Sequence, residues 1–307
     1  MKKLAYYLLY GFVYVISLLP LWLLYGISDV LFLFVYHIIR YRRKIVRKNI
    51  SESFPEKTEK EILQIEKKFY HWFCDYIFET FKLLSISDKN LMKRMEYRGA
   101  EQLDDTFDKG QDVAAMLGHY CNWEWITSIG LSLTRHRDAL IGSIYHGLKN
   151  RTMNELFKVI RSSHGGICVN KRYIILNIRR YVQQNRRYLL GYVSDQAPRW
   201  QNIHLWLEFF NHTTPVFTGG EKIMRMANNA VYYLDLERPK RGKYICTIKL
   251  ITDNPKELPE HEVTKRYFKI LEQSIRRQPE FYLWTHNRWK RTKEEWEKRN
   301  NDSLVNK

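Results

Sequence analysis

The sequence predicts an α/β fold, with a mostly parallel sheet flanked by helices and an N-terminal membrane-anchoring apolar helix. Two observations support this prediction. Short apolar runs of strand length alternate along the chain with segments of helical periodicity, which is typical of parallel strands joined by helices. The 307-residue chain also begins with a stretch of 24 residues, Leu4–Ile27, that holds no charged side chain, and about 20 apolar residues suffice to cross a bilayer.

The apolar N-terminus has competing interpretations. A cleaved signal peptide is disfavoured, because the run is too long for one and no small-residue cleavage site follows it. A buried core helix is the soluble alternative. Pro20 is expected to kink or break a helix, and a second apolar run, Val30–Ile39, follows Asp29. We therefore expect a membrane anchor that either spans the bilayer or lies in one leaflet.

A basic collar follows the apolar segment and predicts its orientation. Lys and Arg are enriched on the cytoplasmic flank of membrane segments, and the collar outnumbers the two lysines that precede the segment. The body of the protein is therefore expected in the cytoplasm, with the collar in contact with anionic lipid. The collar consists of Arg40, Arg42, Arg43, Lys44, Arg47 and Lys48.

The remaining chain divides into a main domain, residues 49–292, and a charged tail, residues 293–307, that is expected to fray. The segment Ser85–Asp104 is polar and irregular. Strands are predicted at Val113–Leu117, Ala139–Tyr145, Tyr188–Val193, Val231–Leu236 and Tyr244–Ile251. Helices are predicted at about Glu56–Leu84, Trp123–Leu133, Lys149–Arg161, Tyr173–Gln184, Gly220–Ala227 and Glu262–Arg277.

The charge balance implies an anionic partner. With 51 Lys and Arg against 33 Asp and Glu, the net charge is +18, which suits nucleic acid, anionic lipid or an acidic protein. The apolar anchor favours lipid, and no nucleic acid is expected. The chain has neither a Walker-type phosphate loop nor a dinucleotide fingerprint. Its cysteines lack C-x-x-C spacing, so no metal or redox site is expected; they are Cys74, Cys121, Cys168 and Cys246.

His119 and Glu124 are the candidate catalytic residues. His119 follows the predicted strand Val113–Leu117, and chemistry in α/β sheets gathers at the carboxyl ends of strands. Residues five apart on a regular helix point away from each other, so a working pair requires His119 in the turn before the helix, with Glu124 reaching back. A neutral imidazole can then take a proton from a hydroxyl that attacks a carbonyl, while a carboxylate holds the other ring nitrogen. A capping His and a surface Glu are the alternative.

Further sequence blocks accompany this element. They are the segment that ends in Arg161, then Gly191–Gln196, Phe209–Asn211, Phe217–Gly220 and Pro279–Lys290. Together with the apolar N-terminus and its collar, these blocks resemble the bacterial lipid A biosynthesis acyltransferases, also called late or secondary acyltransferases, of the lysophospholipid acyltransferase superfamily. The closing run PEFYLWTHNRWK is the most specific part of the resemblance.

The resemblance implies transfer of a fatty acyl chain from an acyl carrier protein thioester to a hydroxyl of a lipid A precursor, at the cytoplasmic side of the bacterial inner membrane. His119 matches the catalytic base and Glu124 its partner, while Arg161 and Asp195 match polar positions that the family needs. No cofactor is implied, because the thioester donor is itself a substrate. For the same reason no Ser or Cys nucleophile is needed.

One departure from the family concerns the acceptor. After Tyr145 the family often has Arg-Pro, whereas this chain has His146-Gly147. A guanidinium can pair with a phosphate bidentately and an imidazole cannot, so the identity of the acceptor stays open at His146. A basic face near the site would suit an acidic carrier protein; its candidate residues are Arg172, Arg179, Arg180, Arg186 and Arg187.

Other functions remain compatible with the sequence. An acyltransferase for a lysophospholipid typically carries Phe-Pro-Glu-Gly, but here Val193-Ser194-Asp195-Gln196 occupies the comparable region. Acylation of an aminolipid or another glycolipid is a second possibility within enzymes. A non-catalytic lipid-binding protein at the membrane surface would keep the anchor and collar but would not need His119 beside Glu124.

Overall fold

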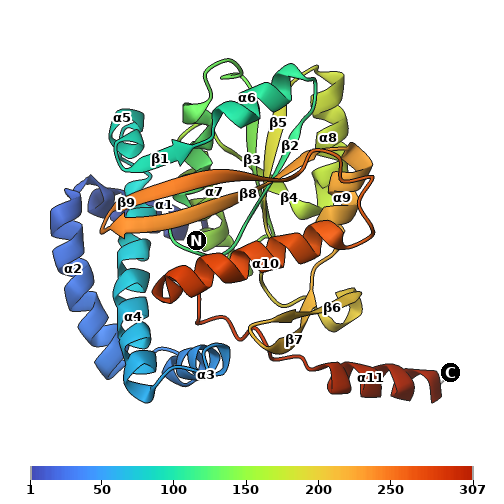
Figure 1. The fold of residues 1–307 in the computed structure, drawn as a ribbon. Coiled ribbons are helices and arrows are strands. Elements are labelled where there is room, and N and C mark those ends of the chain that lie inside the picture. Colours follow the sequence, from blue (N-terminus) through green and yellow to red (C-terminus); the bar gives the residue numbers. More distant parts are fainter. Residues whose placement is uncertain (1, 306–307) are drawn as a thin grey trace.

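A seven-stranded sheet forms the centre of the chain in the computed structural model, which describes residues 2–305 (Figure 1). Its strands are β1 (Met95–Arg98), β2 (Val113–Leu117), β3 (Leu140–Tyr145), β4 (Ile167–Asn170), β5 (Tyr188–Val193), β8 (Ala230–Lys240) and β9 (Lys243–Thr252). Across the sheet they follow the order β1-β9-β8-β2-β5-β3-β4. The strands from β8 to β4 are parallel, whereas β9 is antiparallel to β8 and pairs in parallel with β1. The predicted mostly parallel α/β fold is confirmed.

Strand β2 lies in the middle of this sheet because its sequence, VAAML, has no polar side chain. All five residues are buried, as expected of a parallel strand covered on both faces. The turn that begins with Gly118 therefore follows directly from a fully buried strand. Side chains in this turn are positioned by the core of the sheet.

Helices cover both faces of the sheet, and α10 packs on β8 and β9 while α7 and α8 pack against β4. The predicted bounds of α10 agree with the structure, and a capping box between Thr58 and Glu61 begins α4. These helices are α4 (Glu59–Lys82), α5 (Asp88–Met92), α6 (Glu101–Asp108), α7 (Arg151–Ser162), α8 (Ile174–Gln183), α9 (Gly219–Ala227), α10 (Glu262–Arg277) and α11 (Lys293–Val305). Short 3₁₀ helices occupy Trp125–Ser132, Lys171–Tyr173, Trp200–Asn202 and Pro279–Phe281.

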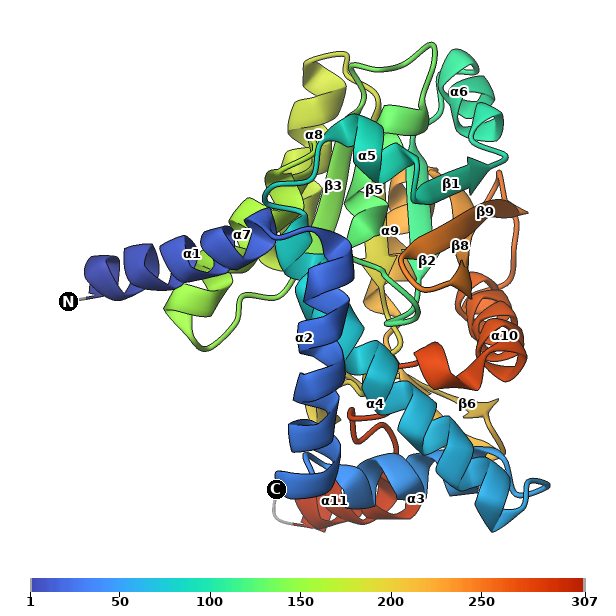
Figure 2. The ribbon, with the colours of Figure 1, turned by 90° about the vertical axis from the view of Figure 1, so that its left-hand side faces the viewer.

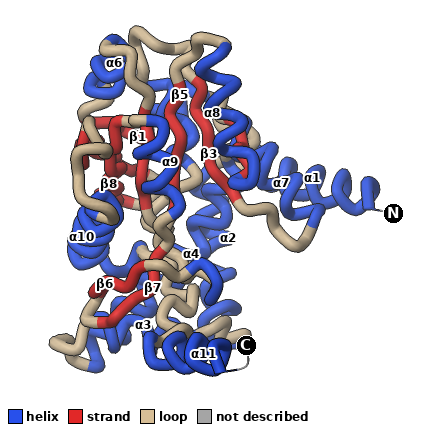
Figure 3. The backbone as a smooth tube through the Cα atoms, turned by 90° about the vertical axis from the view of Figure 1, so that its right-hand side faces the viewer, coloured by secondary structure: helices blue, strands red, loops and turns tan. Residues whose placement is uncertain are grey.

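Several predicted elements were wrong or incomplete. The segment Ser85–Asp104 is not irregular, since it contains α5, β1 and the start of α6, and the predicted helix Trp123–Leu133 is a 3₁₀ helix. Strand β4 was missed. A hairpin of β6 (Leu205–Phe209) and β7 (His212–Val216), which lies apart from the main sheet in Figure 3, was also missed. The charged tail forms helix α11 instead of fraying.

The apolar N-terminus forms two helices and not one continuous span. Helix α1 (Lys2–Leu18) ends before Pro20, and α2 (Leu21–Leu33) begins after it and continues as a π-helix over Phe34–Ile38. The predicted break at Pro20 is thus confirmed. Within residues 2–305, one helical segment, Leu21–Ile38, is long and apolar enough to cross a membrane. Figure 2 shows α1 extending away from the body of the protein, while α2 lies along α4.

Both N-terminal helices carry a large exposed apolar surface. In α1 these side chains recur along the helix, and in α2 they begin with Trp22, which is 73% exposed. A surface of this kind fits contact with lipid. The exposed apolar residues of the two helices and the turn that follows are Leu4, Tyr7, Leu8, Phe12, Tyr14, Val15, Leu18, Trp22, Ile27, Val30, Leu33, Phe34, Ile38 and Ile39.

The basic collar is only partly free to contact lipid. Helix α3 (Arg43–Ser53) carries Arg43 and Arg47, and both pair with the buried carboxylate of Glu66 in α4. Lys44 and Lys48 remain exposed. Part of the collar therefore fixes α3 to α4, which the sequence pattern did not indicate.

Candidate active site

The pairing of β2 with β5 brings two distant polar residues together. The two strands run parallel with Leu117 opposite Val193, so the residues two positions beyond each strand, His119 and Asp195, also lie side by side. Asp195 is almost completely buried, whereas the His119 side chain is 20% exposed. The site thus presents an accessible imidazole whose carboxylate partner is in the protein interior.

Asp195 holds His119 at two points. One carboxylate oxygen lies 2.6 Å from Nδ1 of the ring, and the other accepts a hydrogen bond of 3.2 Å from the main-chain N–H of His119. Burial acts to raise the pKa of the Asp195 carboxyl, but the charge of His119 and these hydrogen bonds outweigh burial and hold the pKa below its ordinary value. Asp195 is therefore ionised at neutral pH and acts as an acceptor towards Nδ1.

The other ring nitrogen of His119 faces the side chain of Gln196. Its Nε2 lies 3.3 Å from the side-chain amide nitrogen of Gln196. With the proton on Nδ1 donated to Asp195, Nε2 carries a lone pair that accepts from this amide. Of the two neutral tautomers of His119, the contacts therefore favour the one that can act as a base at Nε2.

Glu124 pairs with Arg161 and not with the His119 ring. Arg161 donates two hydrogen bonds to the buried Glu124 carboxylate, from Nε at 2.7 Å and from Nη2 at 2.6 Å. Within residues 2–305, no hydrogen bond or ion pair joins the His119 ring to Glu124. The expected contact between the two residues is therefore wrong, because Asp195 already occupies the position of the ring's carboxylate partner.

Trp123 separates the two halves of the expected pair. Its ring meets the His119 ring edge-on at a centroid distance of 5.2 Å, and its Nε1 donates to Glu124 at 3.2 Å. Tyr76 of α4 also points its hydroxyl at this carboxylate, at 3.5 Å. Trp123 contacts both His119 and Glu124, so it connects the imidazole to the ion pair that Glu124 forms with Arg161.

The closing run of the chain supports the turn at His119. The main-chain N–H of Leu283 donates to the carbonyl of His119 at 3.0 Å, and that of Cys121 donates to Phe281 at 2.8 Å. His286 of the same run accepts a hydrogen bond from the main-chain N–H of Ala197, and burial lowers its pKa to about 4, so this ring is neutral. The most specific sequence block is thus a neighbour of the candidate base.

Cys121 is unsuited to act as a nucleophile, although it lies two residues from His119. Its side chain is fully buried, and burial raises the pKa of its thiol well above the ordinary value. Reactive cysteines need an accessible thiolate. Cys121 is therefore not a candidate for a covalent acyl intermediate.

His146 directly follows β3, in a basic surface. Lys171 is the main cause of a lowered pKa of His146, followed by burial and by the charges of Arg199 and Arg172. His146 is exposed and, with a lowered pKa, neutral at pH 7. The neighbouring cations supply the positive charge that the imidazole does not.

The comparisons with known proteins identify the family of the chain. The family model described as Bacterial lipid A biosynthesis acyltransferase matches residues 1–291. The chain belongs to this family. A curated relative, the Lipid A biosynthesis acyltransferase of Haemophilus influenzae, is 21% identical over 279 residues, which cover 89% of this chain and 83% of the relative. As a bacterial lipid A biosynthesis acyltransferase, the chain is an enzyme. The alternative of a non-catalytic lipid-binding protein is therefore excluded.

Sequence reasoning missed several contributors to the site of this acyltransferase. Gln196 follows Asp195 directly, and Trp123 lies between His119 and Glu124, but neither residue was predicted to contribute to the site. Asn122 and His286 were missed as well. Gln196 lies just beyond the end of β5, and this position places it near the end of β2 only once the two strands are known to be neighbours.

Proposed function

We propose that the enzyme moves a fatty acyl chain from an acyl carrier protein thioester to a hydroxyl of a lipid A precursor, with His119 as the general base. The observation that supports this most is the His119–Asp195 pair at the carboxyl end of the central strand. Among residues 2–305, Gln196 is the one proton donor with a hydrogen bond to Nε2 of His119. Mass spectrometry of the product lipid tests it, because the acceptor should gain the mass of one acyl chain.

In the proposed reaction, Nε2 of His119 takes the proton of the acceptor hydroxyl as its oxygen attacks the thioester carbon. A carbon–oxygen bond forms, the carbon–sulfur bond breaks, and the imidazolium returns the proton to the leaving thiolate. Asp195 keeps the proton of Nδ1 in place and stabilises the positive ring between these steps. The acyl carrier protein leaves as a free thiol, so no covalent enzyme intermediate is required.

Glu124 and Arg161 have a supporting part in this proposal. Their bidentate ion pair is rigid, and it fixes the end of the turn that begins at His119. The Nη1 atom of Arg161 makes no hydrogen bond with the residues that the structure describes, so it is available to a polar group of the substrate. Glu124 then acts on His119 by placing Trp123 and the turn, and not by contact with the ring.

The basic surface around His146 is the proposed contact for anionic groups. Lys171, Arg172 and Arg199 lie near His146, and ammonium and guanidinium groups bind phosphate. A lipid A precursor carries phosphate, and acyl carrier proteins are acidic. A lysophospholipid, aminolipid or other glycolipid as acceptor is the second candidate, which the departure at His146-Gly147 leaves open.

We expect the enzyme to stay in the membrane fraction when salt is raised. The apolar faces of α1 and α2 make a contact that salt does not screen, whereas contacts of Lys44 and Lys48 with lipid are screened. Washing bacterial membranes with about 1 M salt, where the screening length is about 3 Å, should release little protein. Complete release in this wash would contradict insertion of the two helices.

A further inference from the structure

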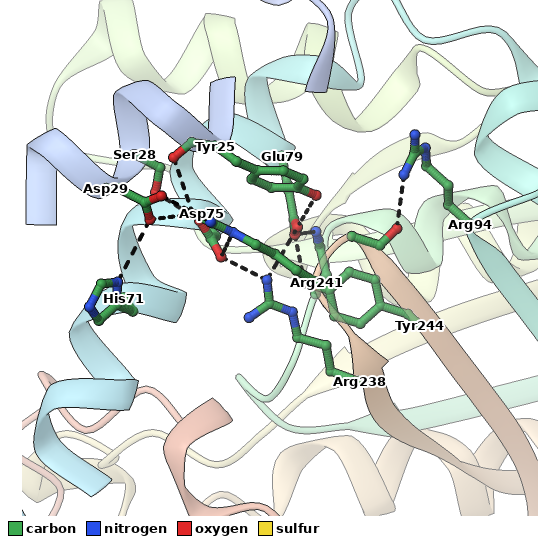
Figure 4. A network of polar contacts seen from close by, with 12 residues as sticks. Tyr25, Ser28, Asp29, His71, Asp75, Glu79, Arg94, Arg238, Arg241 and Tyr244 are labelled. Carbon is green, nitrogen blue, oxygen red and sulfur yellow. Dashed lines mark hydrogen bonds and ion pairs between the residues drawn. The ribbon is translucent and has the colours of Figure 1, made fainter. Parts of the chain in front are cut away.

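A partly buried polar network joins the apolar helix α2 to the body of the protein (Figure 4). Ser28 donates a hydrogen bond to Asp75 of α4 at 2.8 Å, and Asp29 pairs with Arg241 from the turn between β8 and β9 at 2.6 Å. Arg238 and Arg241 also pair with Asp75. Buried polar groups are costly unless they are paired, so this network fixes where α2 lies along α4.

Glu79 of α4 is the central acceptor of the network. Its carboxylate is fully buried and accepts hydrogen bonds from the Tyr25 hydroxyl at 2.9 Å, the Asn122 amide at 2.8 Å and the Tyr244 hydroxyl at 2.6 Å. Arg238 lies 3.8 Å from the same group. All these neighbours donate to the side chain of Glu79, so the position requires a group that accepts hydrogen bonds at both of its terminal atoms.

Asn122 connects Glu79 to the catalytic turn. It lies between His119 and Glu124 in sequence, and its side chain is fully buried. Its amide nitrogen donates to Glu79, while its oxygen accepts from the main-chain N–H of Trp125 at 3.2 Å. The indole of Trp125 donates in turn to the main-chain carbonyl of Glu79 at 2.9 Å. Glu79 of helix α4 thus binds the turn at two points, through its carboxylate and through its main-chain carbonyl.

We propose that Glu79 is a positioning residue for the His119 turn, and that Tyr25 extends this role to helix α2. The proposal rests on His119 acting as the general base. Cys121, within the turn, has a φ of 50°, a conformation that non-glycine residues adopt only when the surroundings hold them there. Helix α2, whose outer face is apolar, therefore helps to set the geometry of the chemistry and does more than anchor the enzyme.

The first test is acyl transfer by the full-length Glu79→Gln protein, with acyl carrier protein thioester and lipid A precursor as substrates. The amide keeps the size of the side chain but presents an NH₂ group to neighbours that donate. We expect kcat to fall about ten- to a hundredfold, since a misplacement of about 1 Å can cost that much, while the KM for the donor stays unchanged. On a His119→Ala background the same substitution should cost no further rate, because residues that act as a unit are not additive.

Further variants separate positioning from general damage to the fold. Tyr25→Phe removes one hydroxyl from α2 and should lower kcat by a smaller factor at unchanged KM. Tyr188→Phe is the matched control, because it removes a buried hydroxyl that accepts from Asn229 at 2.8 Å at the opposite end of β5, and it should leave kcat unchanged. The double variant Glu79→Gln, Asn122→Asp exchanges the amide and the carboxylate and should recover part of the lost kcat.

Two results would overturn the positioning role. One is an equal loss of kcat from Glu79→Gln with and without His119, and the other is normal kcat in Tyr25→Phe. Tyr25→Phe decides the matter if Glu79→Gln does not fold. Near-normal turnover by His119→Ala would be a different failure, because it would remove the general base itself and with it the basis of the proposal.

Discussion

Replacing His119 with alanine is expected to lower the rate of acyl transfer by about 10²- to 10⁴-fold, the usual contribution of a general base. The side chain is partly exposed and packs on few groups besides Trp123 and Asp195, so the variant should fold normally. Initial rates with a purified carrier thioester and lipid acceptor measure the loss. Circular dichroism and thermal unfolding of the same sample verify the fold.

Two outcomes of this experiment would contradict the mechanism. Near-normal turnover by a folded His119→Ala protein would show that the proton of the acceptor is removed elsewhere. A covalent acyl adduct on Cys121, detected by mass spectrometry of the intact protein, would show that transfer proceeds through an enzyme intermediate. We expect no adduct, because this thiol is buried and protonated at neutral pH.

The substitution Asp195→Asn is expected to have the second large effect, a loss of about 10²- to 10⁴-fold in kcat, by comparison with the carboxylates that orient histidines in catalytic triads. Asp195 accepts from both the ring and the main-chain N–H of His119, whereas an amide can accept at one oxygen only. The His119 ring then either adopts the wrong tautomer, or the main-chain N–H of His119 loses its hydrogen bond to residue 195. The double variant with His119→Ala should be little worse than His119→Ala alone.

Glu124→Gln is the informative comparison for Asp195→Asn. The amide leaves Arg161 without its bidentate partner, and an unsatisfied group of this kind costs about 1–3 kcal/mol. We expect thermal stability to fall in both variants, since each leaves a buried donor without its acceptor, and kcat to fall further in Asp195→Asn. A larger loss of kcat in a well-folded Glu124→Gln protein than in Asp195→Asn would instead support Glu124 as the partner of the ring.

The sequence predicted the long and strongly patterned elements of the fold. Strands β2 and β5 and helix α10 have the expected bounds because their apolar runs are continuous or regularly spaced. Strands β1 and β4 are four residues long and lie at the two edges of the sheet, where alternation is too brief to recognise. Hairpin β6–β7 turns through Phe210 and Asn211, both with positive φ, and lacks the glycine that marks such turns in a sequence.

The contacts within the candidate site differ from the one that the sequence suggested. His119 and Glu124 are close in sequence, and the short spacing suggested a contact between them. The Trp123 side chain and the 3₁₀ helix that begins at Trp125 prevent that contact. The partner of His119 is instead 76 positions away. Only the adjacency of β2 and β5 brings Asp195 there, and strand order cannot be deduced from the strands' own sequences. Arg161 was likewise recognised, but its pairing with Glu124 depends on the packing of α7.

The most direct test of the central claim is mass spectrometry of a lipid A precursor incubated with the purified enzyme and acyl carrier protein thioester. The proposed function predicts an acceptor heavier by one acyl chain, joined as an ester to a hydroxyl, and no such product with His119→Ala. Lipids from cells with and without the gene should differ by the same acyl chain. An unchanged precursor, together with an acyl chain gained by a lysophospholipid or aminolipid in the same assay, would contradict the assignment of the acceptor.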